Sequence, residues 1–119
     1  MQDDVYQDLD SCIRDYEKKA EPFDLLPSYE IYFEPGMGFF CYGIEDGDKL
    51  CVDHCNAKDM DYLHAKAKEI AKERGCQYVM TQTFRSPRSY LRKTRSHLDL
   101  TLSGYRPNGK FYWVFIERI

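Results

Sequence analysis

Residues 50–75, "LCVDHCNAKDMDYLHAKAKEIAKERG", constrain the fold of this chain more than any other stretch. A short apolar run passes directly into an amphipathic helix, and Gly75 is placed to end that helix. The apolar face of the helix is formed by Met60, Leu63, Ala67, Ile70 and Ala71. The next segment, "CQYVMTQTF" (76–84), is typical of a strand. A strand, a helix and a strand in this order predict a right-handed crossover between two parallel strands.

The segments before the helix of this unit predict another helix and three strands, the last of which is the first strand of the unit. Residues 3–20 have helical apolar spacing, with acids early and lysines late, as the helix dipole favours. Prolines 22 and 27 break the pattern. Strands are expected at 29–33, 38–44 and 49–55, with "EDGDK" (45–49) as a hairpin turn.

The segments after residue 84 predict a short helix and a closing hairpin. "SPRSYLRKTR" (86–95) has a proline near its first turn, and "RPNG" (106–109) is typical of a turn. The run "KFYWVFIE" (110–117) is continuously apolar, which favours an interior strand covered on both faces. The whole pattern predicts a single α/β (α+β) domain over 1–119: a mixed, mostly antiparallel twisted sheet with helices on both faces.

Charge separates one basic segment from an acidic body. The net charge of −3 argues against wholesale binding to nucleic acid or to a membrane. Five of the positive charges fall in one short stretch: Arg85, Arg88, Arg92, Lys93 and Arg95. This basic segment (85–95) suits an acidic protein surface, or nucleic-acid phosphates with Tyr90 stacked between them, or a solvated helix face.

The five cysteines are expected to be free thiols in a reducing cytoplasm. The first ten residues, "MQDDVYQDLD", are acidic and polar, unlike a signal peptide. No apolar run approaches the roughly 20 residues of a membrane span. We therefore expect a cytoplasmic protein with no membrane contact.

The motif "CVDHC" (51–55) raises the question of a metal site, because Cys51, His54 and Cys55 are all zinc ligands by type. Strand alternation would place Cys51, Asp53 and Cys55 on one side and His54 on the other. A second ligand pair at standard spacing is missing, and the only distant reserves are His64 and Cys76. We expect no metal, and thiols that pack in the core.

Two catalytic alternatives follow from residue type alone. Cys55 or Cys51 could act as a nucleophile with His64 or His97, although no spacing supports it. Asp53 could act as a general base if burial raised its pKa. The competing interpretation of Asp53 is a solvated acid on an edge strand.

The order of elements resembles that of the GNAT superfamily of N-acetyltransferases, without its usual first strand. The chain is similar especially to short GNAT-like proteins of tailed phages, which share a pattern like "SYLRKTR" (89–95) followed by a hairpin ending in "FYWVFIER" (111–118). The resemblance implies an acetyl-CoA site between the strand at 48–54 and the helix at 58–74.

The sequence departs from the superfamily at its functional motifs. The signature Arg/Gln-x-x-Gly-x-Gly/Ala, which holds the pyrophosphate, is replaced by "HCNAKDMDY" (54–62), and Asp59 and Asp61 put negative charge at the helix start. The later helix lacks the usual Asn, and the Gly-Phe pair after it is absent. The resemblance carries over Tyr90 as the acid for the leaving thiolate and offers Asp53 in place of the usual Glu base.

We therefore expect a GNAT-like domain with a degenerate CoA loop and no cofactor. Its expected role is that of a non-catalytic phage or prophage accessory protein, a virion or assembly component or an inhibitor of a host factor. The basic segment would be its contact surface. The alternative is an active N-acyltransferase that uses acetyl-CoA, Tyr90 and Asp53, and a third hypothesis is a small nucleic-acid-binding module. Open sheet edges leave pairing with a second copy as a further expectation.

Overall fold

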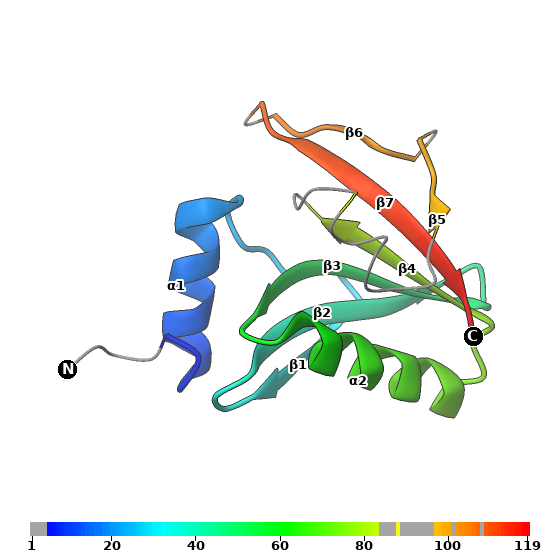
Figure 1. Ribbon diagram of the computed structural model, residues 1–119, viewed down its shortest axis with the longest axis horizontal. Helices are drawn as coiled ribbons and strands as arrows, with labels where there is room; N and C mark the ends of the chain where they lie inside the picture. Colours follow the sequence, from blue (N-terminus) through cyan, green and yellow to red (C-terminus); the bar gives the residue numbers. More distant parts are fainter. Residues whose placement is uncertain (1–4, 84–87, 89–96, 101, 108) are drawn as a thin grey trace.

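The computed structural model describes residues 5–83, 88, 97–100, 102–107 and 109–119 (Figure 1). Within these residues the elements are α1 (Leu9–Lys19), β1 (Glu30–Glu34), β2 (Gly38–Glu45), β3 (Lys49–Ala57), α2 (Met60–Glu73), β4 (Tyr78–Thr83), β5 (His97–Leu98), β6 (Gly104–Tyr105) and β7 (Phe111–Arg118). The strands form one sheet in the order β1-β2-β3-β4-β7-β5, and β6 also pairs with β7. Only β3 and β4 are parallel among the described pairs, which confirms the predicted mixed, mostly antiparallel sheet.

The two helices cover opposite faces of the sheet, as the sequence predicted. Alternate side chains of β2 show this most clearly, since Phe39 and Cys41 pack with Cys12 of α1. Their neighbours Phe40 and Tyr42 pack in the other core, against α2. The strand reads as a continuous apolar run because both of its faces are covered.

The strand–helix–strand unit at the centre of the fold is close to the predicted one. The parallel pairing of β3 with β4 confirms the crossover. The helix α2 is shorter than expected because the side chain of Asp59 caps its start. Arg74 is the C-cap, and Gly75 follows it with φ 75°. The N–H of Cys76 donates to the carbonyl of Ala71 at 2.8 Å, a helix ending that requires the left-handed residue at Gly75.

The first helix begins later than predicted. It was expected from residue 3, but it starts at Leu9, and the described residues 5–8 lie outside it. The carboxylate of Asp8 accepts a hydrogen bond from the backbone N–H of Ser11 at 2.8 Å. This cap satisfies an N–H that a longer helix would have bonded internally, so the helix starts there.

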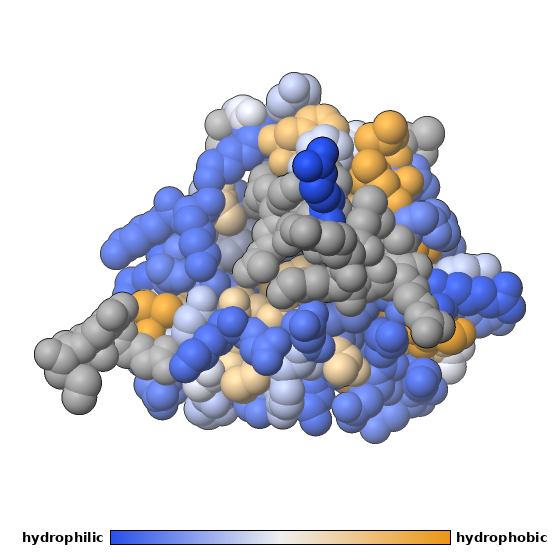
Figure 2. All heavy atoms as spheres, viewed as in Figure 1, coloured by the Kyte–Doolittle hydropathy of each residue, from blue (hydrophilic) through white to orange (hydrophobic). Residues whose placement is uncertain are grey.

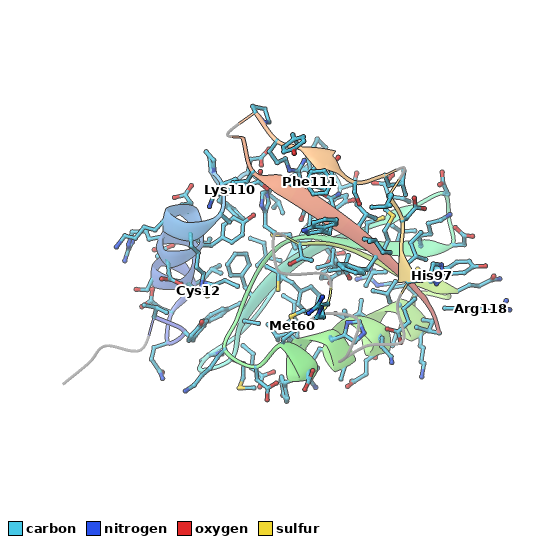
Figure 3. The ribbon with its side chains drawn as sticks, turned by 45° about the horizontal axis from the view of Figure 1, so that its top comes forward. Cys12, Met60, His97, Lys110, Phe111 and Arg118 are labelled. Atoms are coloured by element: carbon cyan, nitrogen blue, oxygen red, sulfur yellow. The ribbon has the colours of Figure 1, made fainter. Side chains whose placement is uncertain are left out.

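The chain closes with the hairpin predicted around residues 106–109, but its first arm is split into β5 and β6. Between them the ladder is bridged by a side chain, since the hydroxyl of Ser103 accepts from the N–H of Val114 at 3.0 Å. In Figure 3, Phe111 lies at one end of β7, and Arg118 lies with His97 at the other. The strand β7 is interior, between β4 and these two short strands.

The surface carries exposed apolar side chains at the connection between β5 and β6. Leu100 and Leu102 are 64% and 47% exposed there, and Figure 2 shows a hydrophobic area over this corner of the molecule. Among the described residues, neither helix is long and apolar enough to cross a bilayer. The helix predicted at 86–95 lies outside the described residues except for Arg88.

Candidate functional site

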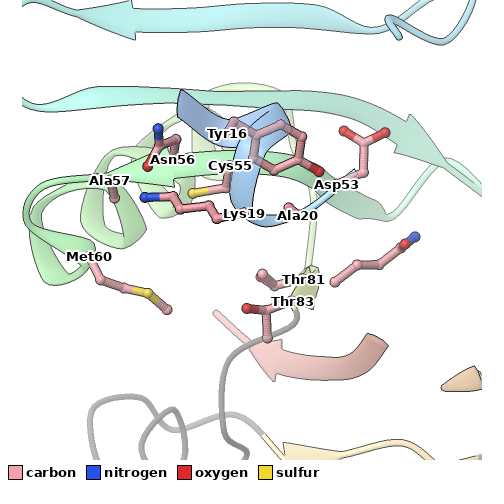
Figure 4. A pocket seen from close by; sticks show the side chains of 11 residues that line it. Tyr16, Lys19, Ala20, Asp53, Cys55, Asn56, Ala57, Met60, Thr81 and Thr83 are labelled. Carbon is pink, nitrogen blue, oxygen red and sulfur yellow. The ribbon is translucent and has the colours of Figure 1, made fainter. Parts of the chain in front are cut away.

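A cavity lined by described residues lies where the parallel strands stop pairing. The ladder between β3 and β4 runs from Lys49↔Tyr78 to Val52↔Thr81. Beyond it, a pocket of about 300 Å³ opens between the ends of both strands, the last turn of α1 and the start of α2 (Figure 4). Its lining combines apolar side chains with the polar ones of Tyr16, Lys19, Asp53, Asn56, Gln82 and Thr83.

A β-bulge decides which side chains of β3 face this pocket. Against β2, Phe40 pairs with Cys55 and Tyr42 pairs with Val52, so two residues of β3 lie opposite Cys41. The bulge breaks the alternation predicted for 51–55. As a result His54 packs on the α1 side of the sheet, and Cys55 packs with the α2 core.

A buried hydrogen-bonded network begins at Tyr16 in the pocket wall. The hydroxyl of Tyr16 lies 2.5 Å from Nδ1 of His54, and Nε2 of His54 lies 3.0 Å from Oδ1 of Asp24. Tyr16 and His54 are each 4% exposed, whereas the Asp24 side chain is 75% exposed. Burial, followed by the charge of Glu21, raises the pKa of the Tyr16 phenol, so the hydroxyl stays protonated.

Arg106 contacts Gln82, one of the residues that line the pocket. Nε of Arg106 lies 3.3 Å from Oε1 of Glu21, and its Nη2 donates to Oε1 of Gln82 at 2.5 Å. Its guanidinium also stacks over the ring of Tyr112, 4.3 Å from the centroid. These contacts join the segment after α1 to β4 and to the β6–β7 hairpin.

Asp53, predicted as a candidate base, lines the pocket beside Tyr16. Burial raises the pKa of its carboxyl above the usual 3.8. The backbone N–H of His54 donates to Oδ1 at 2.6 Å and lowers the pKa, but by less than burial raises it. In Figure 4 the Tyr16 hydroxyl points to the side of the pocket on which Asp53 lies. The pocket therefore holds a phenol and a partly buried carboxyl with perturbed acidities, as functional sites often do.

The junction between β3 and α2 does not suit a diphosphate. The backbone N–H of Tyr62 donates to Oδ1 of Asp59 at 3.2 Å, so the helix start is bonded to its own side chain. Asp61 adds a second acid in the first turn. No glycine lies there to let an anion approach the backbone. The residues at this junction do not fit the diphosphate of a CoA-type donor.

The candidate metal ligands and nucleophiles lie in different surroundings, except for Cys55 and His64. Among the described residues, no group of three or more His, Cys, Asp or Glu side chains could hold a metal ion. Cys55 and His64 line one narrow apolar pocket of about 30 Å³, and Nε2 of His64 lies 2.8 Å from Oε1 of Glu117. The thiol of Cys51 is buried, and burial raises its pKa to about 12.

Most of the predicted residues of the basic segment, and Tyr90, lie outside the described part of the chain. Tyr90, Arg85, Arg92, Lys93 and Arg95 lie outside the described residues, and Arg88 is exposed. Conversely, the sequence patterns did not predict a role in the site for Tyr16, Glu21 and Asp24. Tyr16 belongs to the apolar face of α1 by spacing, and no sequence signal connects it to His54.

Comparison with solved structures identifies the fold. The chain resembles a Bacillus subtilis acetyltransferase solved in complex with CoA, at 13% identity over 79% of each chain and a TM-score of 0.59. It also resembles a GNAT family acetyltransferase from Elizabethkingia anophelis with acetyl-CoA bound, at 8% identity over 77% of each chain and a TM-score of 0.52. An acetyltransferase from Bacillus cereus matches 90% of this chain with 86% of its own, at 16% identity and a TM-score of 0.51.

These matches show that the chain has a GNAT acetyltransferase fold, as the element order predicted. No protein-family model matches the sequence, and no curated protein matches it significantly. The likeness is therefore one of fold, and the chemistry rests on the site itself.

Proposed function

We propose that the chain is an N-acyltransferase whose reaction takes place in the pocket between β3 and β4. The observation that carries this proposal is the position of the pocket, past the last parallel pair Val52↔Thr81, with Tyr16 and Asp53 in its wall. A phenol and a carboxyl are the groups needed to move protons during acyl transfer. Two solved proteins of the same fold contain CoA or acetyl-CoA, which supports a thioester as the donor.

The donor is proposed to bind without a contact between its diphosphate and the start of α2. The carboxylates of Asp59 and Asp61 repel an anion at the helix start, where a CoA diphosphate would be expected. Recognition then falls on the acyl thioester end, which the pocket has room to hold. A short thioester should consequently bind about as well as acetyl-CoA.

The first experiment is a calorimetric titration with acetyl-CoA, with CoA and with S-acetyl-N-acetylcysteamine, a thioester without a nucleotide. We expect the dissociation constants of the two thioesters to agree within about threefold, because the diphosphate gains nothing at α2. A threefold difference corresponds to roughly 0.6 kcal/mol. Thiol release in the presence of butylamine, lysine or spermidine would then report turnover. A folded protein that binds no thioester and releases no thiol would overturn the proposal.

Two residues predicted from the sequence belong to the same assay. Tyr90 is proposed as the acid for the leaving thiolate, and Asp53 as a base. Tyr90→Phe and Asp53→Asn should each lower the turnover rate, by about 100-fold where proton transfer is lost. A rate equal to that of the parent protein would remove the substituted residue from the mechanism.

The second candidate is a binding protein, favoured by the self-capped start of α2. In this role the chain would be a phage or prophage accessory protein in the virion, in assembly or against a host factor. The basic segment would contact an acidic protein or nucleic-acid phosphates, and Arg88 is its one described residue, exposed as this requires.

The second candidate is tested with defined probes. We would titrate the protein with a short single-stranded DNA, a short RNA and a poly-glutamate peptide at two salt concentrations. Arg88→Glu with Arg92→Glu should abolish binding, whereas Lys72→Glu, on the exposed face of α2, should not. Equal binding by both variants would contradict a role for the basic segment. Light scattering would separately report whether two copies of the chain pair.

A further inference from the structure

Three side chains form a continuous path from the pocket to solvent. Tyr16 reaches the pocket from α1, His54 lies behind it on β3, and Asp24 comes from the segment that follows α1. The two joining distances are 2.5 Å and 3.0 Å. The inner members are 4% exposed and the outer carboxylate is 75% exposed.

The direction of the hydrogen bonds follows from the chemistry of the groups. An ionised carboxylate only accepts, so Nε2 of His54 carries the proton and donates to Asp24. In a neutral imidazole Nδ1 is then the acceptor, and the Tyr16 hydroxyl donates to it. The other acceptor of Tyr16 is Oε2 of Glu21 at 3.3 Å, a longer contact.

We propose that Tyr16, His54 and Asp24 form a proton relay that deprotonates a small primary amine bound in the pocket. This inference rests on the proposed acyl transfer and names its acceptor class. Tyr16 is the catalytic residue because it is the member of the path that lines the pocket, and His54 and Asp24 act through it. The carboxyl of Asp53 and the hydroxyls of Thr81 and Thr83 provide acceptors for an ammonium group.

The proton balance of the step is complete. A substrate ammonium carries three protons on nitrogen, and the amide product keeps one. The first proton passes to Tyr16 as Tyr16 passes its own to Nδ1 of His54, and the imidazolium releases its Nε2 proton to water through Asp24. The relay is restored after product release, when Asp24 returns a proton to Nε2 and the Nδ1 proton moves back to Tyr16, which gives one proton to water in the emptied pocket. The amine nitrogen then bonds to the thioester carbon and gives its second proton to the proposed base Asp53. The C–S bond breaks, and the leaving thiolate takes one proton from the proposed acid Tyr90, which the proton on Asp53 replaces.

Carboxylates lie near both ring nitrogens of His54. Oε2 of Glu21 lies 3.5 Å from Nδ1 of His54, and Asp24 lies on the other ring nitrogen. Asp53 is the neighbouring acid on β3, and Arg106 faces the network through Glu21. The positive charge that passes through His54 therefore meets carboxylates on both sides.

The test compares the parent protein with Tyr16→Phe, His54→Gln and Asp24→Asn. Tyr29→Phe is the matched control, because its hydroxyl donates to Glu45 at 2.9 Å outside the pocket. Turnover of S-acetyl-N-acetylcysteamine with butylamine is measured from pH 6 to 10, and ¹⁵N NMR reports the protonation of each ring nitrogen of His54. Asp24→Asn keeps the test valid if a buried variant fails to fold, because this side chain is mostly exposed.

We expect Tyr16→Phe and His54→Gln to lower kcat by about 100-fold with little change in KM for the thioester, and Asp24→Asn by about 10-fold. The ascending limb of the pH–rate profile should move to higher pH in all three variants and stay in place in Tyr29→Phe. Equal activity and equal pH profiles in an active parent would overturn the relay and leave the acyltransferase. A parent inactive with every donor would overturn the proposed function, and with it the relay. NMR that finds the proton on Nδ1 of the neutral imidazole would overturn the direction of transfer on which the relay depends.

Discussion

The sharpest stability prediction concerns Glu117, an acid buried between β7 and α2. Only 2% of this residue is exposed. Its carboxylate oxygens lie 2.8 Å from Nε2 of His64 and 2.8 Å from Nζ of Lys68. Burial by itself would raise the pKa of Glu117, but the hydrogen bonds from Lys68 and His64 outweigh it and lower the pKa below 4.5. The folded state therefore stabilises the ionised carboxylate.

Glu117→Gln keeps the shape of the side chain and removes the charge. Breaking a fully buried ion pair costs about 3–5 kcal/mol, and the Lys68 side chain is 34% exposed, so water recovers part of that loss. We expect the free energy of unfolding to fall by about 2 kcal/mol. With a urea m-value of about 1.5 kcal/mol/M, the midpoint of unfolding should fall by about 1.3 M.

The assay is urea unfolding of the parent and Glu117→Gln from pH 7 down to pH 3, with Glu73→Gln at the exposed end of α2 as the control. A folded-state pKa below the unfolded value means that the stabilisation is fully present above the unfolded pKa of about 4.5. It is lost as the pH falls through the lower, folded value. The difference between the two proteins should thus be constant near neutrality and shrink in acid. Equal midpoints at pH 7 would refute the reasoning.

Three further changes test the packing around the pocket. Gly38→Ala should lower the free energy of unfolding by roughly 2 kcal/mol or more, since a Cβ there would lie 2.0 Å from the carbonyl oxygen of Asn56 at φ 122°; thermal unfolding measures it. Asn56→Ala should cost about 1–3 kcal/mol in the same assay, because its amide donates to the carbonyl of Cys12 at 2.9 Å and joins β3 to α1. Asp59→Ala should cost about 1 kcal/mol through loss of the helix cap, a result that unchanged thermal midpoints would contradict. Thiol labelling at pH 8 should reach Cys55 first, because Cys55 is half-buried whereas the other four cysteines are buried. Burial raises the pKa of one of these, Cys12, to about 11.

Local sequence signals were sufficient for most of the fold. The apolar period of α2, the glycine after it and the short turn at 45–49 are properties of neighbouring residues. Their structures depend on backbone geometry within a few positions, which a sequence shows directly. The order of elements then led to the GNAT-like architecture without any conserved motif.

The start of α1 was predicted less well for a similar local reason. Several acids at the N-terminus can cap a helix, and spacing alone does not choose among them. The structure selects Asp8, whose carboxylate bonds both the N–H and the hydroxyl of Ser11.

The sequence by itself determined the strand–helix–strand core and the absence of glycine at the junction before α2, which together predicted the fold and the unsuitable diphosphate site. Only the tertiary structure decided the site. One extra residue in β3 at the bulge turned His54 toward α1, and packing brought Tyr16, 38 positions away, within hydrogen-bond distance. Such contacts depend on register and on the approach of distant elements, and neither quantity is written in the local pattern of residues.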